Sequence, residues 1–266
     1  MNRKTIVITG STKGIGQGLS VEFLKRNCQV VISGRNRERL KRAEAESAAA
    51  FGSDRLWAVP CDVTDPAQVQ GLWDRSVEHF GRVDIWINNA GIAHPPGELT
   101  DMDAGTVSSV IETNINGLLH GCRTAVKGMK NQGSGAVYNL EGLGSDGRIV
   151  NGMSVYGMTK RAVNYITRAL HRELAGTPVI VGAVYPGMVV TDLLTADLES
   201  MDQEYRSQTE KIINILGDKV ETVTPRLADK ILGNTKSGVT IKWLTGGKVM
   251  VRFMTAGLRK RNVLDQ

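Results

Sequence analysis

Cysteine is scarce in this chain of 266 residues: only Cys28, Cys61 and Cys122 are present, far apart in the sequence. Their odd number, and the absence of Cys-x-x-Cys or Cys/His spacings, argue against a disulfide framework and against a zinc site. Reduced thiols are typical of the cytoplasm, so we expect a cytoplasmic protein without a bound metal.

Long apolar runs are missing as well. The first apolar stretch, residues 5–9, is too short for the core of a signal peptide or for a membrane span, so no transmembrane segment is expected. No linker-like segment, low-complexity run or internal repeat divides the chain, which predicts a single domain over residues 1–266. With 41% hydrophobic and 23% charged residues, the composition is that of an ordinary globular enzyme.

Acidic residues are rare near the C-terminus. Residues 235–266 contain seven basic residues and one acid, Asp265, so the net charge of +6 resides there. A basic tail, here residues 247–266, can bind nucleic acid, an anionic membrane or an acidic partner. We favour a solvated terminal helix and no nucleic-acid partner, because neither aromatic interleaving nor a nucleic-acid motif accompanies the charge. Weak contact of the tail with a membrane surface stays an alternative.

The chain does contain a regular alternation of short β-branched runs and helical patterns. The apolar runs predict strands at residues 5–9, 29–33, 56–60, 83–88, 136–140 and 179–185, with a weaker seventh at 239–244. Helical spacing separates them, for example at residues 15–26, 37–51, 66–80, 154–175, 202–216 and 225–232. The pattern predicts an α/β fold with a doubly wound, parallel, seven-stranded sheet of Rossmann type. In such folds, ligands bind outside the carboxyl ends of the strands.

A glycine-rich turn follows the first predicted strand. Glycine permits a tight turn, and the N–H groups that open the next helix can bind a diphosphate. The segment could be a simple strand–helix turn, but its place at the first such junction favours a dinucleotide site. The spacing Gly10-x-x-x-Gly14-x-Gly16 resembles that of short-chain dehydrogenases/reductases. The candidate residues are Gly10, Ser11, Thr12, Lys13, Gly14, Ile15 and Gly16.

The end of the second strand indicates which dinucleotide binds. An NAD enzyme usually places an acid there to bind the ribose hydroxyls, but this chain reads Ser33-Gly34-Arg35-Asn36. Arg35 and Lys13 could instead pair with a 2′-phosphate, which favours NADPH/NADP+ over the NAD pair. The alternative is that both are ordinary solvated bases.

The resemblance to short-chain dehydrogenases implies that three later strand ends complete the cofactor site. The acid after the third strand can reach the adenine amino group, and the segment after the fourth closes over the adenosine. The segment after the sixth resembles the nicotinamide-side loop of the family. The implied residues are Asp62, Val63, Asn89, Ala90, Gly91, Pro186, Gly187, Val189 and Thr191.

Tyr156 and Lys160 lie four residues apart, which places a phenol and an ammonium on one face of a predicted helix. The ordinary pKa of tyrosine is near 10, and a neighbouring cation would favour the phenolate. Tyr156 could then donate a proton to a forming alkoxide, or remove one in the reverse reaction. A surface pair is the alternative. The resemblance implies that Lys160 also holds the nicotinamide ribose, and that Asn114 rather than Asn116 anchors a water in the proton relay.

The serine expected in this family is missing from its usual place. The resemblance places it at the end of the fifth strand, about thirteen residues before the tyrosine, where it polarises the substrate carbonyl. Here the strand end is Gly142 and the count reaches Leu143. We predict that Ser145, two residues later, serves as a substitute; the alternative is that Ser145 is a turn residue and that no serine assists.

This departure accompanies a closer resemblance. The run Asn139-Leu-Glu-Gly-Leu-Gly-Ser145 and the run Val155-Tyr-Gly-Met-Thr-Lys160 are similar to the corresponding segments of chlorophyll b reductases. The similarity extends from about residue 5 to residue 245. It implies NADPH-dependent reduction of the formyl group of a large tetrapyrrole, chlorophyll b or chlorophyllide b, to a hydroxymethyl group.

Substrate choice is expected to depend on residues 192–222, which follow the sixth strand and carry Leu193, Leu194, Leu198 and Met201. We expect His94 to lie at the rim of the pocket. Two alternatives remain open: a reductase of another bulky carbonyl compound, such as a steroid, a quinone or an acyl ketone, and a non-catalytic NADP(H)-binding regulator. Analogy with the family also predicts a homodimer or homotetramer, formed through the helices that hold Asn114 and Tyr156.

Overall fold

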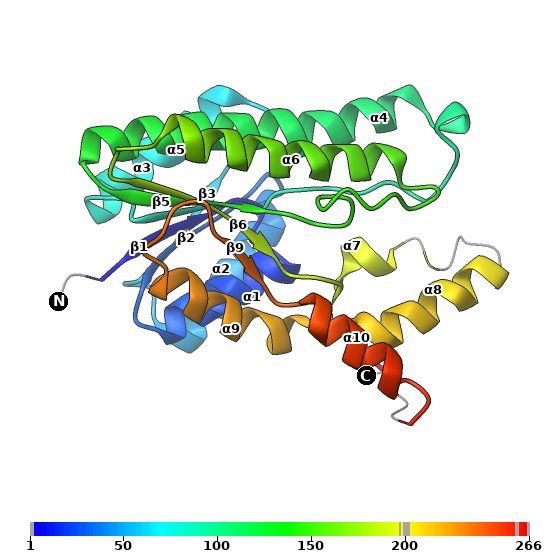
Figure 1. Ribbon diagram of the computed structural model, residues 1–266. Helices are drawn as coiled ribbons and strands as arrows, with labels where there is room; N and C mark the ends of the chain where they lie inside the picture. The colour runs from blue at the N-terminus through cyan, green and yellow to red at the C-terminus, as the bar shows by residue number, and fades with distance from the viewer. Residues whose placement is uncertain (1–2, 197, 199–202, 259–260, 265–266) are drawn as a thin grey trace.

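The computed structural model of the protein describes residues 3–196, 198, 203–258 and 261–264. Its centre is a parallel sheet of seven strands in the order β3-β2-β1-β4-β5-β6-β9 (Figure 1). The predicted fold is confirmed, and the strand bounds differ from the predicted ones by at most two residues. The strands are β1 (Thr5–Ile8), β2 (Gln29–Gly34), β3 (Leu56–Pro60), β4 (Ile85–Asn88), β5 (Gly135–Leu140), β6 (Val179–Tyr185) and β9 (Thr240–Lys242).

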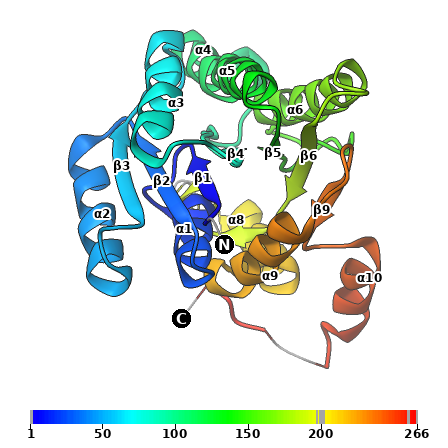
Figure 2. The ribbon, with the colours of Figure 1, turned by 90° about the vertical axis from the view of Figure 1, so that its left-hand side faces the viewer.

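Helices cover both faces of the sheet, because its strands are apolar on both sides. In β1, Ile6 and Ile8 pack into one core with Leu19 of α1, whereas Val7 packs into the other with Leu72 of α3. Figure 2 shows α3, α4, α5 and α6 on one side of the sheet and α1, α2 and α9 on the other. Their bounds are α1 (Gly14–Lys25), α2 (Arg37–Phe51), α3 (Pro66–Phe80), α4 (Ala104–Ile111), α5 (Gly117–Gln132), α6 (Ser154–Glu173) and α9 (Val220–Gly233).

The order of the strands reverses between β1 and β4, which are neighbours in the sheet. The backbone N–H of Thr9 donates to the Ile87 carbonyl at 3.0 Å, so the segments that follow these two strands start side by side. Such a reversal opens a crevice at the carboxyl ends of the strands. The fold therefore places the glycine-rich turn and residues 89–91 at one site.

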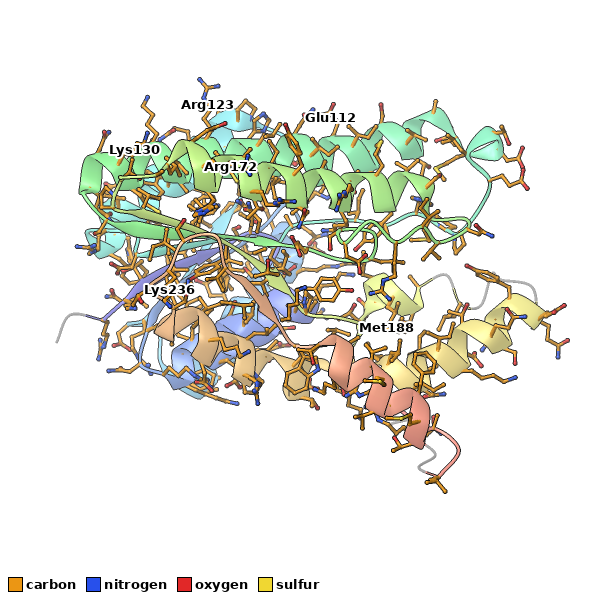
Figure 3. All side chains as sticks on the ribbon, in the orientation of Figure 1. Glu112, Arg123, Lys130, Arg172, Met188 and Lys236 are labelled. Carbon is orange, nitrogen blue, oxygen red and sulfur yellow. The ribbon has the colours of Figure 1, made fainter. Side chains whose placement is uncertain are left out.

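One helical run joins α4 to α5 through a turn of π-helix at Glu112–Asn116. Single π turns inside α-helices are frequent at functional sites, and Asn114 lies in this one. On α5, Arg123 and Lys130 lie at the outer surface of the layer, away from the sheet (Figure 3). The predicted dimer or tetramer through this layer stays a prediction.

Beyond the carboxyl end of the sheet, a second, two-stranded sheet pairs β7 (Val189–Val190) with β8 (Asp218–Lys219) in parallel. Helices α7 (Asp192–Thr195), α8 (Gln203–Leu216) and α10 (Gly246–Thr255) also lie beyond this end of the sheet (Figure 1). The predicted helix at residues 202–216 corresponds to α8, whereas the two-residue strands were not predicted because they are too short to show periodicity. Met201, Arg259, Lys260 and Asp265 lie outside the described residues.

The expectation of a solvated basic tail is wrong for part of it. Asp218, only 4% exposed, accepts from the guanidinium groups of Arg252 and Arg261 and from the Trp243 indole, at 2.6–2.8 Å. A buried carboxylate needs such partners, since leaving it unpaired is costly. The basic tail is thus bound to β8 by a buried ion cluster. Within the described part of the chain, no helix is long and apolar enough to cross a membrane.

Candidate active site

The glycine-rich turn forms a cradle with a backbone that only glycine adopts readily. Gly10 and Gly14 have φ angles of +62° and +58°. A Cβ on Gly10 would lie 2.8 Å from the Ala90 Cα, so the turn packs directly on the segment after β4. Helix α1 begins at Gly14, and the side chain of the preceding Lys13 does not cap it. The first N–H groups of α1 are therefore available to an anion, and the cradle fits a dinucleotide diphosphate.

Polar side chains hold this turn in place. The Ser11 hydroxyl donates to the Ile8 carbonyl at 2.8 Å and accepts from the Ser33 N–H at 2.9 Å, which ties the turn to β2. The Asn89 amide donates to the carbonyls of Thr9 and Gly10 at 2.9 and 2.8 Å. Ser11 and Asn89 thus support the backbone of the turn with their side chains.

Arg35 and Lys13, the two bases expected to bind a 2′-phosphate, have different surroundings. Arg35 is exposed directly after β2, where Gly34 packs against Thr12 of the turn. Lys13 instead makes an ion pair with Asp192 at 2.9 Å, and this contact lowers the pKa of the Asp192 carboxyl. Both side chains of the pair are more than half exposed, so the pair is weak and can exchange partners.

The implied adenine and nicotinamide segments also lie at the carboxyl ends of their strands. The Asp62 carboxylate accepts from the N–H and the hydroxyl of Thr64 at 3.0 and 2.8 Å, while Val63 packs against Gly117 of α5. After β6, Gly187 has a φ angle of +75°, and Val189 starts β7. Thr191 then lies 3.3 Å from the position of a Cβ on Gly14, so the segment after β6 closes on the glycine-rich turn.

Tyr156 and Lys160 lie in the first two turns of α6, beside the end of β5. The Lys160 Nζ atom is 5.6 Å from the centre of the Tyr156 ring and donates to the Leu140 carbonyl at 3.3 Å. Burial lowers the pKa of Lys160 to about 8, against the opposite effect of Glu141. Burial raises the pKa of Tyr156 to about 12. The expected lowering of the Tyr156 pKa is therefore not found, and burial favours the neutral phenol, the form from which a proton is donated.

Asn114 links this pair to the loop after β4. It is 2% exposed, and its amide accepts from the Ile92 N–H and donates to the Ile92 carbonyl, both at 2.9 Å. It also donates to the Thr159 hydroxyl at 3.1 Å. A Cβ on Gly91 would lie 3.3 Å from the Asn114 Oδ1 and 3.5 Å from the Lys160 Nζ. Asn114, Gly91 and Lys160 therefore converge.

At the end of β5, where the family is expected to carry a serine, Gly142 packs against Tyr156. A Cβ on Gly142 would lie 2.8 Å from the Tyr156 hydroxyl oxygen. Ser145 is 1% exposed, its N–H donates to the Gly142 carbonyl at 3.1 Å, and its hydroxyl has no hydrogen-bond partner among the described residues. An unpaired buried hydroxyl costs free energy unless a ligand or water satisfies it.

Comparison with known proteins decides the family of this site. Residues 4–202 match the family model described as short chain dehydrogenase. The chain belongs to the short-chain dehydrogenase family. It is an oxidoreductase of that family, as the glycine spacing and the Tyr–Lys pair predicted.

This short-chain dehydrogenase is similar to proteins named as chlorophyll(ide) b reductases. A chlorophyll(ide) b reductase NOL, chloroplastic, of Oryza sativa subsp. japonica is 37% identical over 259 residues, which cover 94% of this chain and 74% of the relative. The resemblance to chlorophyll b reductases is therefore confirmed. The name of the relative places that protein in the chloroplast; the cytoplasmic location expected here from cysteine usage stays a prediction.

Solved structures match over nearly the whole chain. ElxO with NADP bound is 29% identical with a TM-score of 0.77, covering 93% of this chain and 99% of that one. A 3-ketoacyl-(acyl-carrier-protein) reductase from Brucella melitensis complexed with NADH is 25% identical with a TM-score of 0.77, covering 92% and 98%. NADP and NADH differ in the 2′-phosphate. Similarity to these two structures therefore does not show which of the two cofactors this chain binds.

Three residues that sequence reasoning missed lie close to the Tyr–Lys pair of this short-chain dehydrogenase. Tyr185, at the end of β6, contributes to the raised pKa of Tyr156, and Arg148 interacts with Tyr185. Glu141 follows β5 and acts electrostatically on Lys160. Tyr185 and Glu141 could have been found by the same rule that identified the loops, because each lies at the carboxyl end of a strand.

We expected His94 to lie at the rim of the pocket. The structure instead buries it, with 2% of the residue exposed. Its Nδ1 lies 2.8 Å from the Pro95 carbonyl, which can only accept, so Nδ1 carries the proton. Its Nε2 then accepts from the backbone N–H of Tyr156 at 3.2 Å. His94 caps the first turn of α6 at the residue whose phenol is proposed to react, which the sequence did not reveal because the two residues are 62 positions apart.

We expect His94→Leu to lower kcat about fivefold, since a lost helix cap costs about 1 kcal/mol and loosens the turn that carries Tyr156. His94→Gln, which retains an acceptor at similar reach, should keep most of the rate. Steady-state kinetics of the two variants checks this, with the KM for the cofactor as the internal reference. Equal rates in His94→Leu and wild type would show that the cap does not position Tyr156.

Proposed function

We propose that the protein is an NADP(H)-dependent carbonyl reductase that reduces the formyl group of chlorophyll b or chlorophyllide b to a hydroxymethyl group. The observation that carries the proposal is the Tyr156–Lys160 pair, which lies between the end of β5 and the Asn114–Gly91 contact, beside a glycine cradle. The substrate is inferred from the rice relative, which is named chlorophyll(ide) b reductase.

The residues divide the work of binding. The cradle and the start of α1 hold the diphosphate, and Asp62 and the segment 89–91 line the adenosine side. The segment after β6, with Pro186, Gly187, Val189 and Thr191, lies on the nicotinamide side. Lys160, whose Nζ has donors beyond its bond to Leu140, holds the nicotinamide ribose. NADPH held by these residues would supply a hydride to the carbonyl carbon.

The chemistry assigned to the protein is proton delivery. As the hydride reaches the carbonyl carbon, negative charge develops on the oxygen, and the Tyr156 hydroxyl donates its proton there. A tyrosine with a pKa of about 12 is still far more acidic than an aliphatic alcohol, so the transfer is downhill. Lys160 returns a proton to Tyr156 and takes one up from a water that Asn114 anchors. The balance is one aldehyde, one NADPH and one proton for one alcohol and one NADP+.

A bulky substrate is compatible with the surroundings of Tyr156. Gly142 leaves the space beside the phenol free of a side chain. Large apolar side chains are exposed on the loop before α6, on α6 itself and on α7: Ile149 is 92% exposed, Met158 49% and Leu193 45%. Exposed apolar surface near a site favours an apolar ligand. Leu198, in the segment expected to determine substrate choice, is 6% exposed.

The cofactor preference is tested by a change of charge after β2. Arg35→Asp should lower kcat/KM for NADPH at least about 30-fold and change that for NADH little, because the variant loses a phosphate partner and gains an acid near the ribose. Steady-state kinetics with both cofactors gives the ratio, and Arg37→Asp, at the solvent-exposed first residue of α2, serves as the charge-matched control. A similar loss in both variants would contradict the assignment.

Ser145 is the second residue to test. If its unpaired hydroxyl polarises the substrate carbonyl, Ser145→Ala should lower kcat about tenfold or more, with unchanged cofactor binding. An unaltered kcat would assign Ser145 to the turn alone and leave Tyr156 as the sole donor to the carbonyl.

The substrate itself is tested by incubating the protein with NADPH and chlorophyllide b while following the absorption band of the formyl compound. The proposal expects loss of that band and appearance of the hydroxymethyl product. Turnover of a steroid, quinone or acyl ketone without loss of the band would favour another bulky carbonyl compound. NADPH binding without turnover of any carbonyl would favour a regulator.

A further inference from the structure

Glu141 is a buried acid that the reaction described above does not use. Glu141 follows β5 directly, in the segment where the family has its serine. The residue is 6% exposed. Its Oε1 atom accepts from the Asn164 amide of α6 at 2.7 Å. A buried carboxylate is costly to maintain, so its place beside the proposed active site calls for a function.

The contacts around Glu141 place it next to Lys160. The preceding residue, Leu140, accepts from the Lys160 Nζ at 3.3 Å. The following residue, Gly142, lies so close that an added Cβ would be 3.4 Å from the Lys160 Cε. Asn164, the hydrogen-bond partner of the carboxylate, is one helical turn after Lys160 on the same face of α6. Both chain neighbours of Glu141 therefore lie against Lys160, and its hydrogen-bond partner is one helical turn away from Lys160.

An electrostatic interaction links the Glu141 side chain to Lys160. Burial lowers the pKa of Lys160, and Glu141 is the group that acts in the opposite direction. Arg148 and Asp146 act on Tyr185, which in turn acts on Tyr156. Glu141 also lines a cavity of about 380 Å³ together with two arginines of α6, Arg168 and Arg172, the latter labelled in Figure 3.

We propose that Glu141 is a positioning residue of the reaction, whose carboxylate keeps the buried Lys160 side chain in its ammonium form. An ammonium donates three hydrogen bonds and stabilises negative charge on the Tyr156 oxygen after proton transfer, whereas a neutral amine does so poorly. The acid after β5 thereby offsets the burial of the lysine. This inference rests on the proposed catalytic roles of Tyr156 and Lys160.

The ionisation of Lys160 can be measured without turnover. In protein labelled with ¹³C at lysine Cε, the Lys160 signal is assigned by its loss in Lys160→Arg and is then titrated by NMR. Glu141→Gln keeps the size and an acceptor for Asn164 but removes the charge, so the midpoint should move to lower pH by about one unit. Asn164→Ala, which frees the carboxylate from its tether, should move it in the same direction by less, and Glu141→Asp should leave it near the wild-type value.

An unchanged midpoint in Glu141→Gln would overturn the proposal, and so would an unchanged midpoint in Asn164→Ala if the glutamine variant fails to fold. A second readout is the pH profile of NADPH-dependent reduction of chlorophyllide b. The loss of rate in Glu141→Gln should grow towards high pH, where the lysine deprotonates; an equal loss at every pH would indicate a merely structural role. If chlorophyllide b is not reduced at all, the proposed function fails while the NMR titration still decides the role of Glu141.

Discussion

Tyr156→Phe is expected to lower kcat for carbonyl reduction by about 10³-fold, within the range for loss of a general acid. Phenylalanine fills nearly the same volume, so the first turn of α6 and the cap by His94 should persist. The variant loses only the hydroxyl that lies against Gly142. Single-turnover measurement with saturating NADPH isolates the chemical step from cofactor binding and product release.

Tyr165→Phe is the matched control for this change. Tyr165 lies on the same helix, but it is 72% exposed. The Tyr165→Phe protein should retain the wild-type rate. The Kd for NADPH should be unchanged in Tyr156→Phe and in Tyr165→Phe. A Tyr156→Phe protein that retains a tenth or more of the wild-type rate would remove Tyr156 from the reaction.

Asp218→Ala is expected to lower the free energy of unfolding by about 3–5 kcal/mol, because it leaves two guanidinium groups without their buried counter-charge. Arg252 and Arg261 also donate to the carbonyls of Leu216 and Gly217, so the change loosens the end of α8 together with β8. Denaturant unfolding, followed by circular dichroism, measures the difference.

The control for Asp218 is an acid in an exposed ion pair. Asp229 pairs with Arg26, but its side chain is 65% exposed, so Asp229→Ala should cost less than about 1 kcal/mol. Because β8 pairs with β7, which carries Val189, the Asp218 variant should also bind cofactor more weakly. If the two variants are equally stable, the buried cluster does not hold the C-terminal segment.

Features that depend on local pattern were predictable from the sequence. Apolar runs located all seven strands, and parallel topology then brought Gly10, Asn89 and Gly187 to one edge without any knowledge of tertiary contacts. The spacing of Tyr156 and Lys160 placed them on one face of α6 for the same reason. In each case the information resides in residues a few positions apart or in a general rule of α/β sheets.

Features that depend on distant partners were not predictable. The charge of Arg252 suggested solvent, whereas its partner Asp218 lies 34 positions earlier and is buried. His94 contacts Tyr156 across 62 positions, and no periodicity records that contact. The pKa of Tyr156 was expected to fall because Lys160 is near, but the burial of both groups is a property of the packed site, and it dominates.

In the proposed reaction, this chain transfers a hydride from a bound nicotinamide to a formyl carbon. The most direct test uses NADPH carrying deuterium at both C4 positions, with chlorophyllide b as the acceptor. We expect a hydroxymethyl product that contains one deuterium on the former formyl carbon, detected by mass spectrometry and located by NMR, and formation of this product about 10³-fold more slowly with Tyr156→Phe. A product without deuterium, or unconsumed chlorophyllide b in the presence of bound NADPH, would contradict it.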